Sequence, residues 1–396
     1  MKNLIYIILL AVSLPAITLH HAISLINTNA LQLHMLDKNL SAKQQNINEA
    51  KRLFPNNPIF RVSFSRIDFS PNAYNFKISQ KINIASQAHY KTLMAQNSYK
   101  AASLNIKQTK ISLITQTQKI FYKAWLDRQN IAIIDNILIY ENQLQQQIKD
   151  KINSGAQLQG SDAIVLVSLS QYKSEKTQYM LDLHVQKIRL SNILNQHIGS
   201  INTSFKKDFS NITLTDLNKQ IGKNYRILMI NHQIDRLRAN LQMLQKSRYL
   251  SYVKLGFNYG LNANNITNAR SETITLSLPI PVTNSHQYSI ASLMDKISKL
   301  QYKKELTANR IKANVKIFFS GLQTAVKLVS LYKKTVLKEL KIYLNATKRR
   351  YKNGLIPLEV MQSAFMNFAS TKQRYIQERY DILLDKLNIY QELSHD

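Results

Sequence analysis

Nine histidines are the side chains best suited to acid–base catalysis or metal binding, and they are scattered along the 396-residue chain. The chain contains no HExxH metal motif, no GxGxxG, no phosphate-binding P-loop and no nucleophile elbow. The adjacent pair His20 and His21 suits adventitious metal binding, and Trp125 is typical of a packing residue. Zero cysteines exclude disulfides, thiol catalysis, Cys-ligated zinc and lipidation through a lipobox cysteine. We therefore expect no enzyme and no cofactor.

A second set of candidate residues surrounds two glycines, Gly155 and Gly354, which interrupt long runs of helix-forming residues. A glycine at a helix end adopts positive φ and lets the chain turn back into an antiparallel helix. Charged residues and one tyrosine flank these turns, namely Asp162, Arg349, Arg350, Tyr351 and Glu359. Acidic residues at helix starts are also ordinary partners of the helix dipole.

The elements that position these turns form a duplicated unit, because two halves align about 198 residues apart. Only 8 glycines and 7 prolines punctuate the chain, which favours long helices. The first half, 23–200, predicts a helix over about 23–54, strands over about 59–69 and 74–84, and long helices over about 85–153 and 161–198. The second half, 201–396, predicts a helix over about 215–247, strands over about 250–262 and 272–281, and long helices over about 285–352 and 357–393.

Residues 1–22 are predicted to be a secretory signal. A short positive start is followed by an apolar run too short to span a membrane, with no stop-transfer pattern after it. The cleavage position stays open between two alternatives, Ala11-Val12-Ser13 and Ala22. A buried N-terminal helix is the competing interpretation, which Pro15 disfavours.

The predicted strands alternate strictly between apolar and polar residues, as in Val253, Leu255, Phe257, Tyr259 and Leu261. The first strand changes parity before Ile67 and Phe69, as a β-bulge requires. A run of nine to eleven alternating residues is long enough to cross a bilayer at a tilt, although a half-buried soluble sheet has the same pattern.

The long helices favour the membrane interpretation, because they carry narrow coiled-coil stripes rather than broad core faces. A helix of about 65 residues is on the order of 100 Å long, which suits a rod across the periplasm. Four strands with an apolar outer face leave open edges that lipid does not tolerate. Three chains with four strands each would close a twelve-stranded barrel and pack the helices into a hollow α-barrel below it.

The duplicated order and three local signatures resemble the TolC family of outer-membrane efflux proteins. The signatures are Leu276–Ile280 on a strand, Arg350–Leu355 followed by Glu359 and Val360, and the helix end Leu190–Gly199. The resemblance covers nearly all of the mature chain. It implies a mainly α fold with a small transmembrane β part, in a homotrimer. It also implies a passive exit duct in outer-membrane lipid, coupled to an inner-membrane pump through a periplasmic adaptor.

The same resemblance implies two functional regions. The adaptor-contact tip would comprise Ser154, Gly155, Asn353, Gly354 and Leu355. The periplasmic aperture would be held by Asp162, Glu359, Arg349, Arg350 and Tyr351. Pro357 departs from the Ser or Thr common in the family, which puts adaptor specificity in doubt.

The formal net charge of +30 is spread along the chain without a localised patch, so nucleic acid is not expected as a partner. A lumen lined by Lys and Arg would favour anions, whereas charge on outer helix faces would not. The alternative from another class is a basic coiled-coil scaffold or nucleic-acid-binding protein. That alternative leaves the alternating strands and the signal without explanation.

Overall fold

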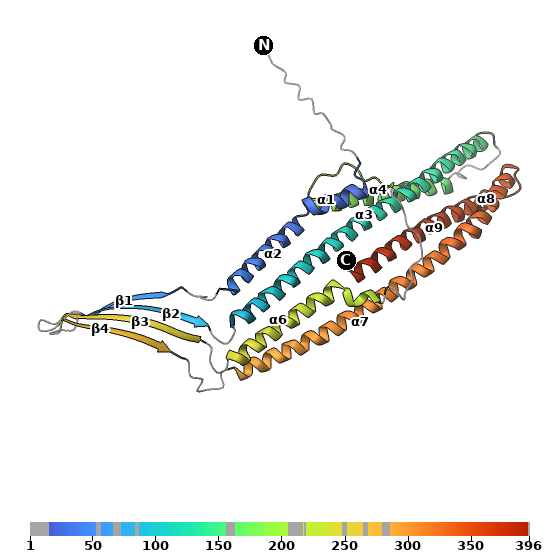
Figure 1. The fold of residues 1–396 in the computed structure, drawn as a ribbon. Helices are drawn as coiled ribbons and strands as arrows, with labels where there is room; N and C mark the ends of the chain where they lie inside the picture. Colours follow the sequence, from blue (N-terminus) through green and yellow to red (C-terminus); the bar gives the residue numbers. More distant parts are fainter. Residues whose placement is uncertain are drawn as a thin grey trace, which may run out of the picture.

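The computed structural model describes residues 16–52, 57–65, 73–83, 87–155, 163–204, 217, 219–247, 252–263, 268–278 and 286–394. The molecule is elongated, with a four-stranded sheet at one end and two helical hairpin tips at the other (Figure 1). Long helices run between these two ends, so the sheet and the tips are separated by the length of the bundle (Figure 1).

The sheet combines a hairpin from each half of the chain. β1 (Ile59–Ser65), β2 (Ala73–Asn83), β3 (Tyr252–Ala263) and β4 (Asn268–Ser277) lie in the order β1-β2-β3-β4, with every neighbouring pair antiparallel. Pairing of β2 with β3 therefore joins the two halves directly. The register is regular throughout β1, and the bulge predicted before Ile67 lies outside the described residues.

The helices of the first half are α1 (Leu19–Asn29), α2 (Leu31–Ala50), α3 (Gln87–Asn153) and α4 (Ala163–Leu194). The single helix expected over 23–54 is instead two helices, because Ala30 has an extended backbone with φ −71° and ψ 105°. Beside the break, the Asn29 amide donates to Gln196 Oε1 at 3.0 Å. The helix break at Ala30 is thus accompanied by a contact with a residue far away in the sequence. No local sequence pattern predicts this break.

The helices of the second half are η1 (Ile221–Lys223), α6 (Tyr225–Ser247), α7 (Gln287–Leu331), α8 (Leu337–Lys352) and α9 (Leu358–Leu393). A π-helical segment, η2 (Tyr332–Val336), connects α7 to α8. The wider turn of this segment does not end the helix. It rotates the apolar stripe of α8 about the helix axis relative to the apolar stripe of α7.

In each half, the start of one helix meets the end of another. The start of α1 meets the end of α4 in the first half, and the start of α6 meets the end of α9 in the second half. In the first, the Ile17 amide donates to the Ser200 carbonyl at 2.9 Å and the Asn202 amide donates to the Ile17 carbonyl at 2.8 Å. In the second, the Tyr225 amide donates to the Ser394 carbonyl at 3.0 Å. Asn224 Nδ2 also donates to the Leu393 carbonyl at 3.0 Å, so backbone groups at both junctions are satisfied.

The apolar core is strung along the bundle as separate clusters rather than gathered in one centre. One cluster, around Phe121, joins α1, α3 and α4, and another, around Val315, joins α7 and α9. A third cluster, around Ile148 and Met361, lies close to the tips and joins the helical hairpins of the two halves. This succession of small cores keeps the helices packed side by side along their whole length.

Candidate functional site

Two glycine turns close the helical hairpins at the end of the bundle farthest from the sheet (Figure 1). At the second turn the Gly354 amide donates to the Tyr351 carbonyl at 3.0 Å and the Leu355 amide donates to the Arg350 carbonyl at 2.9 Å. These two bonds form a Schellman motif, with Gly354 in the left-handed conformation at φ +69°. At the first turn the Gly155 amide donates to the Ile152 carbonyl at 3.0 Å, and φ is +72°.

The glycines are required by backbone conformation rather than by space, because a Cβ atom at either position would meet nothing within 4 Å. The five residues predicted for the adaptor-contact tip, Ser154, Gly155, Asn353, Gly354 and Leu355, are all exposed. Leu355 keeps 67% of its surface accessible, so an apolar side chain stands at the tip among polar ones. Ala156 lies outside the described residues.

The predicted aperture residues are placed in different ways. Arg349 and Arg350 are exposed in the last turn of α8, and Glu359 is exposed in the first turn of α9. Tyr351 is half-buried, and Asp162 lies outside the described residues. Among the part of the chain that the structure describes, no ion pair joins either arginine to Glu359.

Tyr351 is the aperture candidate that contacts the other hairpin. The Lys151 ammonium on α3 lies 4.9 Å from the centroid of the Tyr351 ring, which is cation–π distance. Burial, together with the charge of Glu359, raises the pKa of the Tyr351 hydroxyl. That hydroxyl has no hydrogen-bond partner among the described residues.

Behind Tyr351, aromatic side chains lock the two hairpins together. Tyr140 on α3 stacks on Phe365 on α9 with ring centroids 4.1 Å apart, and its hydroxyl donates to Met361 Sδ. The Lys348 ammonium on α8 lies 4.3 Å from the centroid of the Tyr140 ring, and burial lowers the pKa of Lys348. A groove of about 460 Å³ between the hairpins is lined by Tyr140, Lys348, Lys151 and Tyr351 among others.

Sequence reasoning missed Tyr140, Lys151 and Lys348, because no local pattern distinguishes a helical tyrosine or lysine that reaches another helix. It also missed Glu141, which is completely buried and accepts from Gln362 Nε2 at 3.5 Å. Burial raises the pKa of Glu141, while the bond from Gln362 acts in the opposite direction. An acidic residue within an otherwise apolar helix stripe was the available signal.

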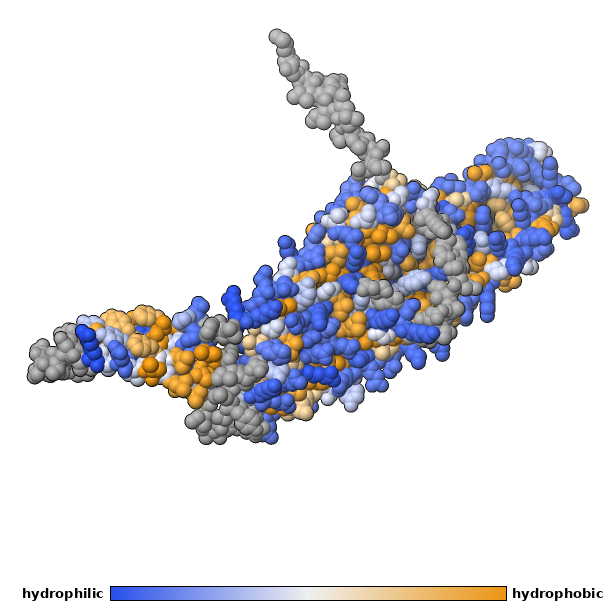
Figure 2. Space-filling model, viewed as in Figure 1, coloured by the Kyte–Doolittle hydropathy of each residue, from blue (hydrophilic) through white to orange (hydrophobic). Residues whose placement is uncertain are grey.

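The sheet at the opposite end exposes its large apolar side chains. Ile274 keeps 82% of its surface accessible and Phe64 keeps 70%, and the exposed set also contains Phe60, Val62, Tyr74, Ile78, Leu255, Phe257 and Leu276. The register places these residues on one face, with Ile78 opposite Phe257 and Phe257 opposite Ile274. Hydrophobic surface accordingly gathers on the sheet, whereas the tips are mainly hydrophilic (Figure 2).

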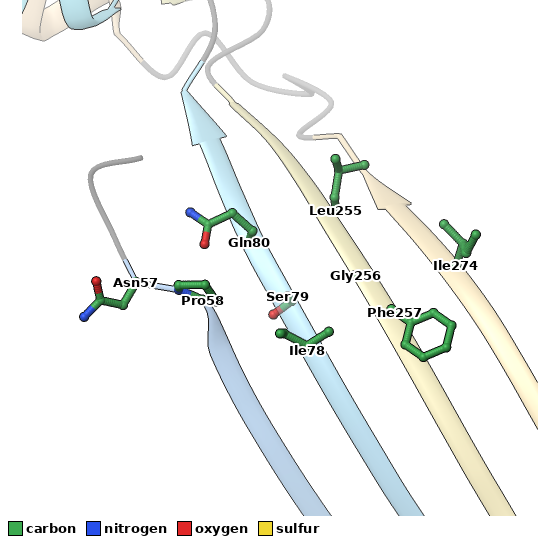
Figure 3. Close-up of a pocket in the computed structure, with 9 residues that line it drawn as sticks. All are labelled: Asn57, Pro58, Ile78, Ser79, Gln80, Leu255, Gly256, Phe257 and Ile274. Carbon is green, nitrogen blue, oxygen red and sulfur yellow. The ribbon is translucent and has the colours of Figure 1, made fainter. Parts of the chain in front are cut away.

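A hollow of about 610 Å³ lies on this sheet surface (Figure 3). Ile78, Phe257 and Ile274 line it from three neighbouring strands, and Pro58 and Gln80 also border it. A contiguous exposed apolar face of this kind is unusual for a soluble protein and indicates contact with lipid or with another protein.

Within the described ranges, no group of three or more His, Cys, Asp and Glu residues is arranged to hold a metal ion. Among the described helices, none is both long enough and apolar enough to cross a membrane.

Comparison with known proteins identifies this fold. CusC, whose crystal structures concern folding and transmembrane channel formation, superposes with a TM-score of 0.83 at 12% identity, over 96% of this chain and 92% of that one. The outer membrane protein VceC of Vibrio cholerae gives 0.80 at 12% identity, over 95% and 96%. The MtrE outer membrane channel of Neisseria gonorrhoeae in its open state gives 0.75 at 13%, over 95% and 89%. No protein-family model and no curated protein sequence matches the chain.

These superpositions confirm the predicted fold class, since nearly the whole chain is mainly helical with four antiparallel strands arranged as in TolC-like channels.

Proposed function

We propose that this chain is one of three identical subunits of an outer-membrane channel, the exit duct of a tripartite efflux or type I secretion system. The observation that carries the proposal is the uncovered sheet, whose large apolar side chains are exposed on one face. Its likeness in fold to the channels CusC, VceC and MtrE supports the same interpretation.

The open edges of the sheet support oligomerisation. β1 and β4 are the outer strands, so each has one edge that is unpaired within the described sheet. Unpaired backbone groups are costly in hydrocarbon, and closure into a barrel is the arrangement that satisfies them. Joining β4 of one subunit to β1 of the next repeats the same contact around a ring, and three subunits supply twelve strands.

The helical layer below the sheet also has two outer helices that a neighbouring subunit could cover. α2 packs on α3, α3 on α6, and α6 on α7, so α2 and α7 lie at opposite sides of the described helical layer. Both carry large exposed apolar side chains, namely Leu31, Met35, Tyr288, Met294, Tyr302, Leu306 and Ile317. A neighbouring subunit would bury these side chains in the same ring that closes the barrel.

The tip would be the contact for a periplasmic adaptor that joins the channel to an inner-membrane pump. Ser154, Gly155, Asn353, Gly354 and Leu355 are exposed on the glycine turns at the far end of the bundle. Exposed Leu355 supplies an apolar group for such a contact. The pump supplies the energy and the channel is a passive conduit.

The aperture would lie where the two hairpins converge. Tyr351 and Lys151 connect the two hairpins, and Arg349, Arg350 and Glu359 lie near Tyr351 in sequence. Asp162 is included in the same proposal from its sequence position alone. Replacing Tyr351 with Ala should increase conductance if the ring obstructs the entrance, and Lys341→Ala, at an exposed position on α8 outside the proposed aperture, serves as the control.

Export requires removal of the signal within residues 1–22, and the geometry favours cleavage after Ser13. Ile17 is hydrogen-bonded to Ser200 and Asn202, and the Thr18 hydroxyl caps α1 by accepting from the His21 amide at 3.3 Å. Cleavage after Ala22 would remove all of these contacts. Mass spectrometry of the mature N-terminus distinguishes the two positions.

Membrane fractionation followed by unheated gel electrophoresis tests the main proposal. We expect the protein in the outer-membrane fraction, migrating as a trimer that dissociates on heating. Purified protein should also form conducting pores in planar lipid bilayers. A soluble monomer absent from the outer membrane would contradict the channel and favour a basic coiled-coil scaffold.

A further inference from the structure

The face of the sheet opposite the apolar one is strongly cationic. Residues alternate between the two faces along each strand, and the register assigns Arg61, Lys77, Lys81 and Lys254 to the polar face. Glu272 lies on the apolar face, in register with Tyr259. On the polar face of the described strands there is no carboxylate to balance the four cations.

The positive charges lie directly opposite one another across neighbouring strands. Arg61 pairs in register with Lys77, and Lys81 pairs in register with Lys254. Like charges directly opposite each other in an antiparallel pair are destabilising. Two such pairs on one face are an arrangement that an anionic partner would relieve.

The side chains around the cations are suited to anions as well. The Lys81 ammonium lies 3.9 Å from the centroid of the Tyr252 ring, which holds it on the polar face. In the row of Arg61 and Lys77, the next positions in register are Asn258 and Thr273. Amide and hydroxyl donors beside guanidinium and ammonium groups are a combination that binds carboxylates, sulfates and phosphates.

We propose that these residues form two positive belts inside the closed barrel, and that the channel selects anionic solutes. This inference rests on the proposed channel, because barrel closure in lipid turns the apolar face outward and the polar face toward the lumen. The first belt contains Arg61 and Lys77, and the second contains Lys81 and Lys254. Each subunit of the ring contributes two residues to each belt.

The spacing of the belts allows them to act together. Lys77 and Lys81 are four residues apart on β2, which is about 13 Å at 3.3 Å per residue. This separation exceeds the Debye length of about 8 Å at physiological salt but lies within the length of about 30 Å at 0.01 M. Pore walls of low dielectric constant focus the field of the charges, so the two belts together concentrate anions along a continuous part of the lumen and repel cations, most strongly at low salt.

The experiment measures the reversal potential of the purified full-length channel in a planar bilayer under a potassium chloride gradient. Wild type should pass chloride several-fold better than potassium, and more so at low salt. The variant R61Q/K77Q/K81Q/K254Q should lose most of this preference. The charge-conserving variant R61K/K77R/K81R/K254R should retain it, which controls for changes in packing. Arg270→Gln, on the apolar face, should also leave the preference unchanged.

The outcomes separate the inference from the function on which it rests. Pores that prefer potassium, or a chloride preference that survives the fourfold Gln substitution, would overturn the anion belts while leaving the channel intact. Complete absence of conductance from trimeric wild type in the bilayer would overturn the channel itself, and the belts with it. Loss of preference in the Gln variant alone supports the belts.

Discussion

The helical bundle and the sheet use the same apolar residue types in opposite ways. In the bundle, Phe121 and Ile148 are completely buried between helices, as in a protein dissolved in water. In the sheet, Phe257 and Ile274 are turned outward, and the polar residues that alternate with them lie on the other face. In the proposed channel, the helical end of the chain therefore faces water and the apolar face of the sheet faces lipid.

Phe257→Lys should abolish membrane assembly. Phe257 lies near the middle of β3 on the apolar face, and a lysine facing lipid near the bilayer midplane costs about 2–4 kcal/mol per subunit. The trimer band on an unheated gel of the outer-membrane fraction reports the loss. Ser63→Lys, at an exposed polar-face position in register with uncharged Asn75, should assemble normally. Equal loss in both variants would show that the sheet does not have one lipid face.

Ile148→Ala should destabilise the tip by about 2–5 kcal/mol, because it leaves a cavity in the cluster that joins the two hairpins. Denaturant unfolding followed by circular dichroism in detergent measures the change. Ile139→Ala, on the same helix at a position 58% exposed, should change stability by less than about 0.5 kcal/mol. A loss at Ile139 as large as that at Ile148 would show that a neighbouring subunit buries it.

Gly354→Ala should cost about 1–2 kcal/mol, because alanine is strained at φ +69° although its Cβ meets no atom. Amide hydrogen exchange at the end of α8 should show faster local opening. Gly354→Asn should be better tolerated, since asparagine adopts this conformation more readily. Gly222→Ala provides the control, because its backbone is not in the left-handed region and its surroundings are equally open. Equal effects at Gly354 and Gly222 would refute the conformational argument.

Asp385→Asn should stabilise the bundle at neutral pH by a small amount. Burial, and then the charge of Asp381, raise the pKa of Asp385 to about 6. A raised carboxyl pKa means that the folded state binds the proton more tightly than the unfolded state. Stability is therefore lost as pH rises from the ordinary value of about 4 through 6. The wild type should lose stability over this range relative to Asp385→Asn.

Unfolding midpoints at pH 4, 5, 6 and 7 measure this difference, which should vanish toward pH 4. Asp295→Asn, at an exposed position on α7, should leave the pH dependence as it is in wild type. A parallel pH response of wild type and Asp385→Asn would refute the assignment.

Much of the fold followed from local periodicity. Alternation in Val253, Leu255 and Phe257 predicted a strand with one apolar face, and the glycines Gly155 and Gly354 predicted the helical turns. The internal duplication predicted that each half would repeat the order of elements. These features depend on neighbours within a few residues, so sequence alone determines them.

Contacts between elements that are far apart in the chain could be read only from the tertiary structure. The pairing of β2 with β3, the break at Ala30, and the contacts of Tyr140 with Phe365 and Lys151 with Tyr351 all depend on elements far apart in the chain. A single sequence does not record which distant face a helical side chain meets, because many faces offer similar apolar stripes. The sequence alone therefore determined that this chain has an amphipathic sheet and long rods. Packing alone decided which residues hold the hairpins together, and that the two hairpins share one sheet whose register sets Arg61 opposite Lys77 and Lys81 opposite Lys254.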